Sequence, residues 1–320
     1  MKPSVLLRIL VTLFFIGCLY FIVREDLAQV KVALLGVQPL FLTAGILLNI
    51  FIVGLASVRL RWFFKAYGLR FSLGEAISLS FIGIFFNNFL PTAAGGDLVK
   101  AYYAYKRAHR KLESFASVVA DRIMGLFSLA CMAVVGLLFL WKGEKLSIKI
   151  AVGGFFLLGC FCVSILFSHR VARKLQFLFY PLERMGLGER MRNIYRTLNI
   201  LNKKHSLLLK TLGLSFSIHL LAIFSAFLLV KGLFLKISIF RLFLVLPLVT
   251  TASMLPSLNG LGIREGAFIY FLGGIVGKAK AAAFSILWLG NLILLSFIGG
   301  IVYLFIGGSV SLKEIQEVKS

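Results

Sequence analysis

The sequence is dominated by long apolar runs that are separated by short polar segments. A helix that crosses a membrane needs about 20 predominantly apolar residues, and each run is long enough to cross or nearly so. The pattern therefore predicts an all-α polytopic membrane protein with eight apolar segments. These segments lie at about 5–23, 39–58, 73–95, 115–140, 149–167, 211–230, 242–277 and 281–306.

Two of these runs, 73–95 and 242–277, contain residues that interrupt helices. Each run includes the order Leu-Pro-(Thr/Ser)-x-x-Gly, and the two copies are 165 residues apart. Proline removes a helical hydrogen bond, and irregular backbone at membrane depth is tolerated only where protein buries it or a wet cavity lines it. The interrupting residues are Pro91, Gly95 and Gly96 in the first run, and Pro247, Pro256, Gly260 and Gly262 in the second.

The basic residues of the loops favour one of two topologies. If all eight runs cross, with the N-terminus inside, the inner segments hold only 14 of the 35 Lys and Arg residues. If 73–95 and 242–277 instead enter and leave on the same side, the inner segments hold 23 and the outer ones 11. Positive residues gather on the cytoplasmic side, so the second arrangement is preferred.

We therefore expect about six spanning helices plus two re-entrant helical hairpins, with both termini cytoplasmic. One hairpin then enters from each side, as in transporters built from an inverted repeat, whose substrate site lies near the middle of the bilayer. Two kinked spanning helices with a coincidental sequence match are the alternative.

The composition agrees with a membrane protein. Apolar residues make up 60% of the chain and charged residues 15%, which is outside the range of ordinary soluble domains. The net charge of +23 is expected to face anionic lipid headgroups rather than nucleic acid. The four cysteines lie in apolar runs, without persuasive disulfide or metal spacing. We expect a multi-pass plasma-membrane protein with no cofactor and no metal; its oligomeric state is open.

The chain is predicted to form a single integral-membrane domain over residues 1–310, followed by a short polar tail at 311–320. A basic cytoplasmic loop at 168–210 holds ten Lys and Arg residues. Apolar residues at helical spacing within it suit an amphipathic helix on the inner leaflet, and a solvated basic loop is the alternative. These residues are Met191, Ile194, Leu198 and Leu201.

Polar residues at or near membrane depth are the candidates for a site. Asp97 can cap the helix that follows it, and the N–H groups of Gly95 and Gly96 can face a phosphate, with Lys100 one turn further on. Asn88 and Asn259 offer neutral donors and acceptors near the two breaks.

Four ionisable residues extend this set. Asp121 and Arg122 lie six residues into an apolar run, where charged groups usually face a partner or a cavity. Arg122 is expected to pair with a lipid phosphate, with Asp97 or with Asp121, unless it snorkels to the interface. Arg264 and Glu265 follow the second break, where a helix-start role is the alternative to a site role. His219, inside an apolar run, is expected to be a packing residue.

The motifs, in order, resemble the lysylphosphatidylglycerol synthase transmembrane-region family, also called flippase-like domain proteins. They are Asn88-x-Leu90-Pro91-x-x-x-Gly95-Gly96-Asp97-x-x-Lys100, then Asp121-Arg122-x-x-Gly125-Leu126, then Pro256-x-x-x-Gly260-x-Gly262-x-Arg264-Glu265. The resemblance spans nearly the whole chain, and Lys100 stands where many relatives are expected to have Arg.

This resemblance implies a membrane domain that moves aminoacylated phospholipid between leaflets, beside a soluble aminoacyltransferase domain that we do not expect here. We therefore predict binding and translocation of an anionic or polyprenyl-phosphate lipid, and no catalytic residue. An intramembrane aminoacyl or glycosyl transferase, or a non-catalytic partner of a separately encoded transferase, is the alternative. Seven residues are expected to bind the headgroup, namely Asn88, Gly95, Gly96, Lys100, Arg122, Asn259 and Arg264. Three are expected to be charge partners or to carry coupling protons, namely Asp97, Asp121 and Glu265.

Overall fold

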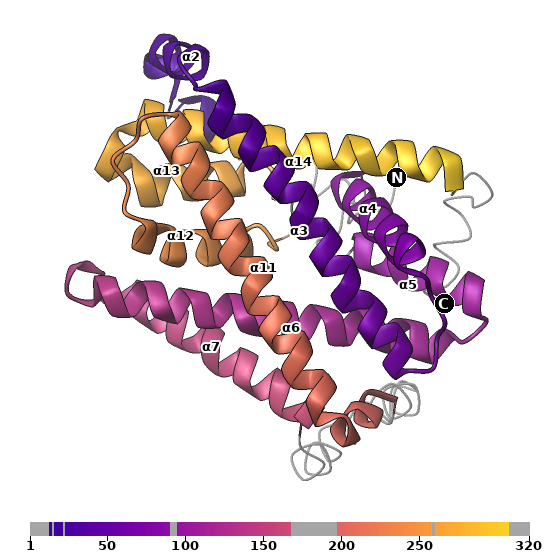
Figure 1. Cartoon of the computed structure of the whole chain (residues 1–320). Helices are drawn as coiled ribbons and strands as arrows, with labels where there is room; N and C mark the ends of the chain where they lie inside the picture. The colour runs from indigo at the N-terminus through magenta and orange to yellow at the C-terminus, as the bar shows by residue number, and fades with distance from the viewer. Residues whose placement is uncertain are drawn as a thin grey trace.

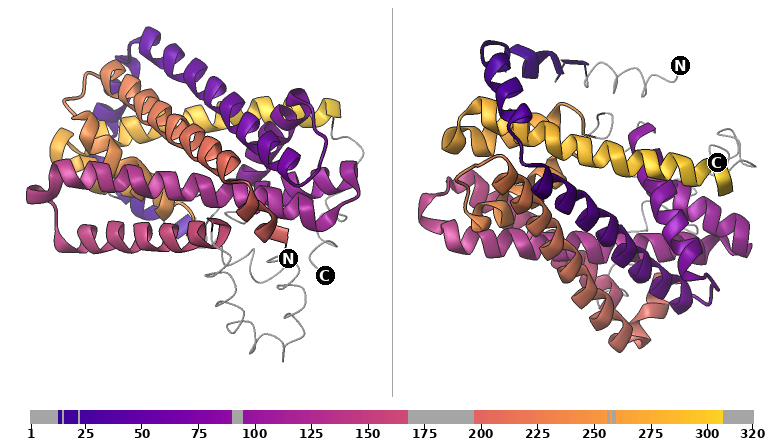
Figure 2. Two further views of the ribbon diagram at one scale, coloured as in Figure 1. Left: turned by 60° about the horizontal axis from the view of Figure 1, so that its bottom comes forward. Right: turned by 45° about the horizontal axis from the view of Figure 1, so that its top comes forward.

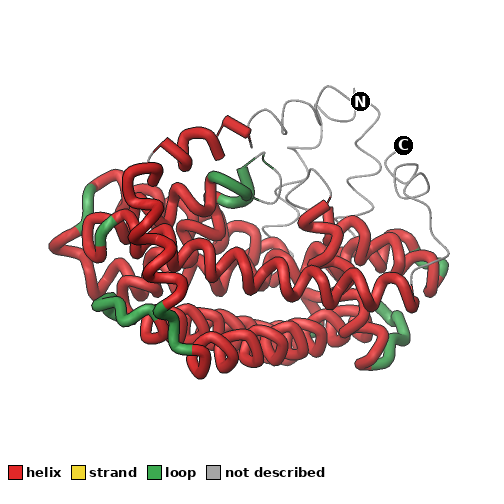
Figure 3. The backbone as a smooth tube through the Cα atoms, turned by 90° about the horizontal axis from the view of Figure 1, so that it is seen from above, coloured by secondary structure: helices red, strands yellow, loops and turns green. Residues whose placement is uncertain are grey.

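The computed structural model describes residues 13, 14, 16–21, 23–89, 95–167, 197–255, 257 and 260–306. Over these residues the regular structure is helical, with no strand (Figures 1 and 3). A short 3₁₀ helix at Arg24–Asp26 leads into the first labelled α-helix. The α-helices are α2 (Leu27–Leu35), α3 (Pro39–Ala66), α4 (Leu73–Phe89), α5 (Gly95–Ala108), α6 (Lys111–Leu140), α7 (Leu146–Phe167), α11 (His205–Gly232), α12 (Ile239–Ala252), α13 (Ile263–Val276) and α14 (Lys278–Ile306).

Five helices of the described part are long and apolar enough to cross a membrane, namely α3, α6, α7, α11 and α14. They correspond to five of the six spanning runs predicted from the sequence. The remaining run, 5–23, lies largely outside the described residues. The all-helical, multi-pass membrane class is therefore confirmed.

The long helices α3 and α11 pack side by side in opposite directions (Figure 1). Gly45 of α3 lies against Ser225 of α11, whereas Arg59, further along α3, donates to the earlier residue Ser215. The Asn49 amide also donates to Ser225, at 2.8 Å. These contacts hold together two helices from opposite halves of the sequence.

The element order α3–α4–α5–α6 is repeated as α11–α12–α13–α14. The main contacts among these eight helices occur in matching pairs: α4 packs against α14 as α12 packs against α6, and α5 packs against α6 as α13 packs against α14. Both α3 and α11 contain 28 residues, and both α5 and α13 contain 14. The structure is thus built from two matching halves that interleave (Figure 2).

Glycines mark the corresponding crossings between the halves. An added Cβ at Gly299 of α14 would meet the carbonyl oxygen of Phe81 in α4, and one at Gly136 of α6 would meet the backbone N of Leu244 in α12. Small residues allow membrane helices to approach this closely. The interleaving therefore depends on one glycine at each of the two equivalent positions.

The sequence breaks separate short helices. Helix α5 follows α4 after residues 90–94, and α13 follows α12 after a segment that includes Gly260 and Gly262 at φ +73° and +80°. At about 1.5 Å per residue, a 14-residue helix is about 21 Å long, shorter than the bilayer core of about 30 Å. The short helices are α5, α12 and α13, each with 14 residues. Pro91, Pro256 and Asn259 lie outside the described residues.

The structure differs from the prediction in several places, including the start of α11 at His205, inside the predicted loop 168–210. Helix α3 does not end at residue 58 but continues to Ala66, because apolar residues lie both before and after Arg59 in the sequence. The predicted loop 24–38 contains α2. Leu198 and Leu201 are buried in a protein cluster that includes Phe63 of α3, rather than facing lipid. Residues 168–196 of the predicted basic loop, and the tail 311–320, lie outside the described residues.

Candidate functional site

A cavity of about 260 Å³ lies among α3, α4, α5, α6, α11 and α12. Most of the described residues that line it are apolar. The lining also includes the sequence neighbours Asp121 and Arg122 and two residues from the start of α5. The charged lining residues are Arg59, Asp97, Lys100, Asp121 and Arg122. Ionisable groups at such a depth usually face a partner or a cavity, and here they face both.

Asp97 holds two cations at the edge of this cavity. Its Oδ1 atom accepts from Lys100 Nζ at 3.2 Å, and its Oδ2 atom lies 3.3 Å from Arg122 Nη1. The Asp97 and Lys100 side chains are 16% exposed, whereas that of Arg122 is 39% exposed. One of the pairings expected for Arg122 is therefore present, and its guanidinium stays accessible.

Asp121 is held by an arginine from a different helix. Arg59 donates from Nε to Asp121 Oδ1 at 2.7 Å and from Nη2 to Oδ2 at 3.1 Å, and its Nη1 donates to Ser215 Oγ at 2.8 Å. Bidentate pairs of this type fix the planes of both groups. The two side chains are only 8% and 15% exposed, so they form a buried junction between α3, α6 and α11.

The packing of α4 against α5 explains the position of Lys100. Gly83 has no side chain, and the Lys100 side chain occupies the place where a Cβ at residue 83 would lie. Gly96 approaches the backbone of Gly83 equally closely, and its N–H donates to Asn87 Oδ1 at 2.8 Å. These glycines bring the charged start of α5 against α4.

Asp97 lies in the first turn of α5, which begins two residues earlier at Gly95. Its carboxylate is directed to Lys100 and Arg122 across the cavity edge. The lipid-binding roles expected for Gly95 and Gly96 stay predictions; what the structure adds is that both glycines are buried at the α4–α5 contact.

His219 also lines the charged cavity. Its Nε2 atom lies 2.9 Å from the carbonyl oxygen of Gly125, so the ring is satisfied by the backbone of α6. This contact agrees with the packing role predicted for His219.

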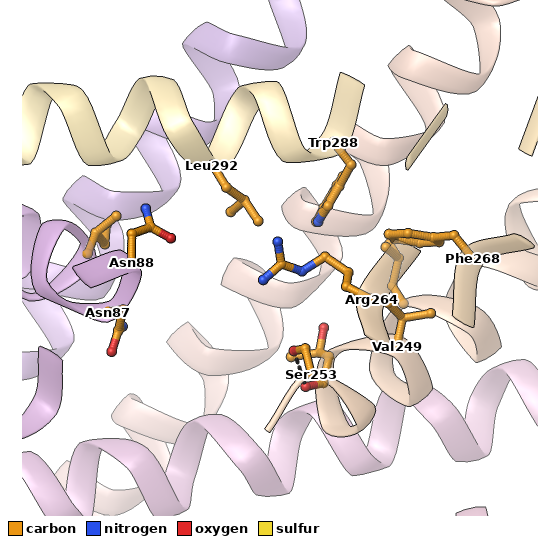
Figure 4. Close-up of a pocket in the computed structure, with 11 residues that line it drawn as sticks. Asn87, Asn88, Val249, Ser253, Arg264, Phe268, Trp288 and Leu292 are labelled. Carbon is orange, nitrogen blue, oxygen red and sulfur yellow. Dashed lines mark hydrogen bonds between the residues drawn. The ribbon is translucent and has the colours of Figure 1, made fainter. Parts of the chain in front are cut away.

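A second cavity of about 310 Å³ adjoins the first, because Ile84 and Thr250 line both. Figure 4 shows the guanidinium of Arg264 extending from α13 into this space, with Asn88 on the far side and Trp288 of α14 beside it. Among the described residues that line this second cavity, Arg264 is the one with a charged side chain. The two sequence breaks therefore contribute to neighbouring cavities at the centre of the protein.

Glu265 supports the start of α13. Its Oε2 atom accepts from the N–H of Gly262 at 2.6 Å, as in a capping interaction, and Oε1 lies 3.9 Å from Arg264 Nη1. This is the helix-start role that the sequence offered as one alternative for Glu265. Among the described residues, no group of three or more His, Cys, Asp or Glu could hold a metal ion.

Arg59 and Ser215 are the site residues that the sequence did not indicate. Arg59 follows the run 39–58 and was assigned to a loop because it is charged. The apolar residues after it, through Phe64, were the available signal that the helix continues. Ser215 lies inside an apolar run and gave no comparable signal.

The fold and cavities define a multi-pass membrane protein with a charged interior. Its sequence matches the profile of the lysylphosphatidylglycerol synthase TM region over residues 5–300, and the chain belongs to this family. It is 26% identical over 314 residues to a UPF0104 membrane protein of Methanothermobacter thermautotrophicus, covering 91% of this chain and 92% of that protein.

A second relative, a UPF0104 membrane protein of Pyrococcus horikoshii, is 32% identical over 102 residues, which cover 31% of this chain and 30% of that protein. No solved structure matches the chain at a significant level. The predicted family is thus confirmed, and the relatives' names place them in a membrane without stating an activity.

Proposed function

We propose that this protein binds the anionic headgroup of a membrane lipid in the central cavities and moves the lipid between leaflets. The observation that carries this proposal is the formal charge of the first cavity. Three cations, Arg59, Lys100 and Arg122, face two carboxylates, Asp97 and Asp121, inside a bundle of apolar helices. Uncompensated charge away from water is unfavourable, and a phosphate group supplies the missing negative charge.

The second cavity adds a further cation. Arg264 faces a cavity that shares the lining residues Ile84 and Thr250 with the first one, and Asn88 offers an amide on its other side. Arginine suits phosphate because its planar group can donate two parallel hydrogen bonds. An anionic phospholipid or a polyprenyl phosphate is the class of ligand that this lining favours, and the family name supports a phospholipid.

We place the two matching halves in the membrane as an inverted repeat. The opposite directions of α3 and α11, which hold equivalent places in the two halves, support this arrangement. Segments α4–α5 and α12–α13 are then re-entrant hairpins that enter from opposite faces, and the cavities lie near the midplane. We further propose a plasma-membrane location with both termini in the cytoplasm.

The ion pairs of the two carboxylates in the first cavity favour lipid translocation over transferase chemistry. A transferase that activates its acceptor needs a general base within reach of the reacting proton. Asp121 is held by two hydrogen bonds from Arg59, and Asp97 is held by Lys100 and Arg122. Both carboxylates are therefore engaged by cations of the protein itself, and neither is free to act as a general base on a bound acceptor.

The proposal is tested by leaflet exchange in vesicles. Purified protein is reconstituted into phosphatidylcholine vesicles that contain fluorescent phosphatidylglycerol or a polyprenyl phosphate, and a membrane-impermeant quencher reports the accessible fraction. The protein should accelerate exchange of one of these lipids, and Arg122→Gln should abolish the acceleration. Arg107→Gln is the matched control, because Arg107 is 66% exposed and pairs with Glu75 outside the cavities.

Absence of acceleration across the lipid panel would overturn the proposal, as would equal activity of Arg122→Gln and the unmodified protein. Lipid mass spectrometry of cells that lack the gene separates the transferase alternative, since a covalently altered lipid would support that alternative instead. Co-purification with a transferase would support the role of a non-catalytic partner.

A further inference from the structure

An apolar groove of about 200 Å³ lies between α5 and α6, beside the charged cavity. Leu98 and Ala101 line it from α5, and Phe115, Val119 and Ile123 line it from α6. Asp97 and Arg122 also line the groove, and both line the charged cavity as well. The groove and the cavity therefore meet at the Asp97–Arg122 ion pair.

The groove opens towards the surroundings of the protein. Val119 is 39% exposed, and Leu112, two turns earlier on α6, is 41% exposed. Helix α6 is one of the five helices long and apolar enough to span a membrane, so apolar residues exposed along it are expected to face hydrocarbon. The groove thus combines the charged side chains of Asp97 and Arg122 with apolar walls that are expected to face lipid.

We infer that this groove holds the first part of a hydrocarbon chain of the lipid whose anionic headgroup sits at Arg122. The inference rests on the proposed lipid-binding function and deepens it by placing the chain. An amphiphile needs a charged contact and an apolar channel within one molecule's reach, and here the 39% exposed Arg122 lines the same groove as the apolar residues of α5 and α6. A soluble phosphate ester would leave the apolar walls of α5 and α6 without an occupant.

A second apolar groove between α4 and α14 is the natural comparison. It has a volume of about 260 Å³ and adjoins the Arg264 cavity through Asn88. The residue that it shares with that cavity is a neutral amide, whereas the α5–α6 groove shares the Asp97–Arg122 ion pair with its cavity and so includes the partly exposed cation Arg122. Charge therefore selects the α5–α6 groove as the place where the chain joins an anionic headgroup.

The experiment uses a phosphatidylglycerol that carries a photoreactive diazirine on one acyl chain, in phosphatidylcholine vesicles with the full-length protein. Adducts are expected on peptides that cover 98–101 and 115–123. Val119→Trp should remove these adducts by filling the groove. Val135→Trp is the control, because Val135 lies on the same helix and is 37% exposed, close to the 39% of Val119. It should keep the adducts.

A second variant separates blockage from misfolding. Val119→Cys is made in a background without the four native cysteines, folded, and then modified with a bulky thiol reagent. Loss of adducts on modification supports the inference, because the protein has already folded with an open groove. Adducts that persist after modification, or that concentrate on Ile293 and Phe297 in the α4–α14 groove, overturn it.

The outcomes also distinguish this inference from the proposed function. If phosphatidylglycerol binding depends on Arg122 but is unchanged in Val119→Trp, the groove assignment fails while headgroup binding stands. If neither phosphatidylglycerol nor a polyprenyl phosphate binds the unmodified protein, the proposed function fails as well. If soluble glycerol phosphate competes at Arg122 as effectively as the whole lipid, the chain contributes nothing and the inference is overturned.

Discussion

The buried pair of Arg59 and Asp121 gives the sharpest prediction for stability. Replacing Arg59 with Leu removes both hydrogen bonds to the Asp121 carboxylate, at 2.7 and 3.1 Å, and leaves that carboxylate without its cation in a site where it is 15% exposed. Two unit charges about 4 Å apart attract by about 4 kcal/mol at an effective dielectric constant of about 20. Removing one partner of a buried pair is destabilising by about 3–5 kcal/mol.

The double variant Arg59→Leu, Asp121→Leu should recover most of this loss. It removes the stranded charge, and replacement of a whole buried pair by apolar residues is often neutral or stabilising. Unfolding is followed in mixed micelles by titration with a denaturing detergent, with intrinsic tryptophan fluorescence as the signal. The order of stability should be unmodified protein, then the double variant close to it, then Arg59→Leu far below.

The exposed pair of Arg107 and Glu75 provides the control. Its side chains are 66% and 37% exposed, and such pairs contribute about 0–1 kcal/mol. Arg107→Leu should therefore shift the unfolding midpoint much less than Arg59→Leu. The reasoning is refuted if the two single variants lose equal stability, or if the double variant is no more stable than Arg59→Leu.

Three further predictions concern packing, pH and the contact between the halves. Gly96→Ala should lower stability by about 1–3 kcal/mol, because the new methyl would press on α4; Gly74→Ala, with open space around it, should be neutral in the same titration. Glu75, at the exposed start of α4, has a lowered pKa, chiefly because its carboxylate accepts from the Ser72 N–H. The stabilising contribution of the ionised Glu75 carboxylate is present at neutral pH and is lost as the pH falls through the lowered pKa. The melting temperature of the unmodified protein should therefore exceed that of Glu75→Gln at about pH 7 and approach it at about pH 3. Asn49→Ala removes the hydrogen bond that the Asn49 amide donates from α3 to Ser225 of α11. It should lower stability by about 0.6 kcal/mol, the usual size of such hydrogen bonds in membrane bundles, and a variant as stable as the unmodified protein in the detergent titration would contradict the prediction.

The sequence was sufficient to locate most of the helices. Membrane thickness sets the length of an apolar run, so the runs that became α6, α7, α11 and α14 are visible without tertiary information. The predicted end of α3 before Arg59 was wrong, because a charged residue after an apolar run resembles the start of a loop. Only the partner, Asp121, 62 residues away, makes that charge acceptable inside a helix.

The candidate site was predicted in part for a similar reason. Asp97 and Arg122 stood out because each is ionisable near a break or within an apolar run, and their pairing was one of the options. The placement of their cavity beside that of Arg264 depends on the packing of α4 against α14 and of α12 against α6. Such long-range packing leaves no periodic signal in a single sequence, so neither the division into two adjacent cavities nor the role of Ser215 could be derived from it.

The crossing of α4 by α14 bears on how the protein is made. The carbonyl of Phe81 fits against Gly299, a residue that leaves the ribosome more than 200 positions later. Until then, α4 lies in the translocon or the bilayer without its principal neighbour. The early half of the protein therefore lacks this contact until α14 is inserted, and a chain released before that point would leave the α14-facing side of α4 uncovered.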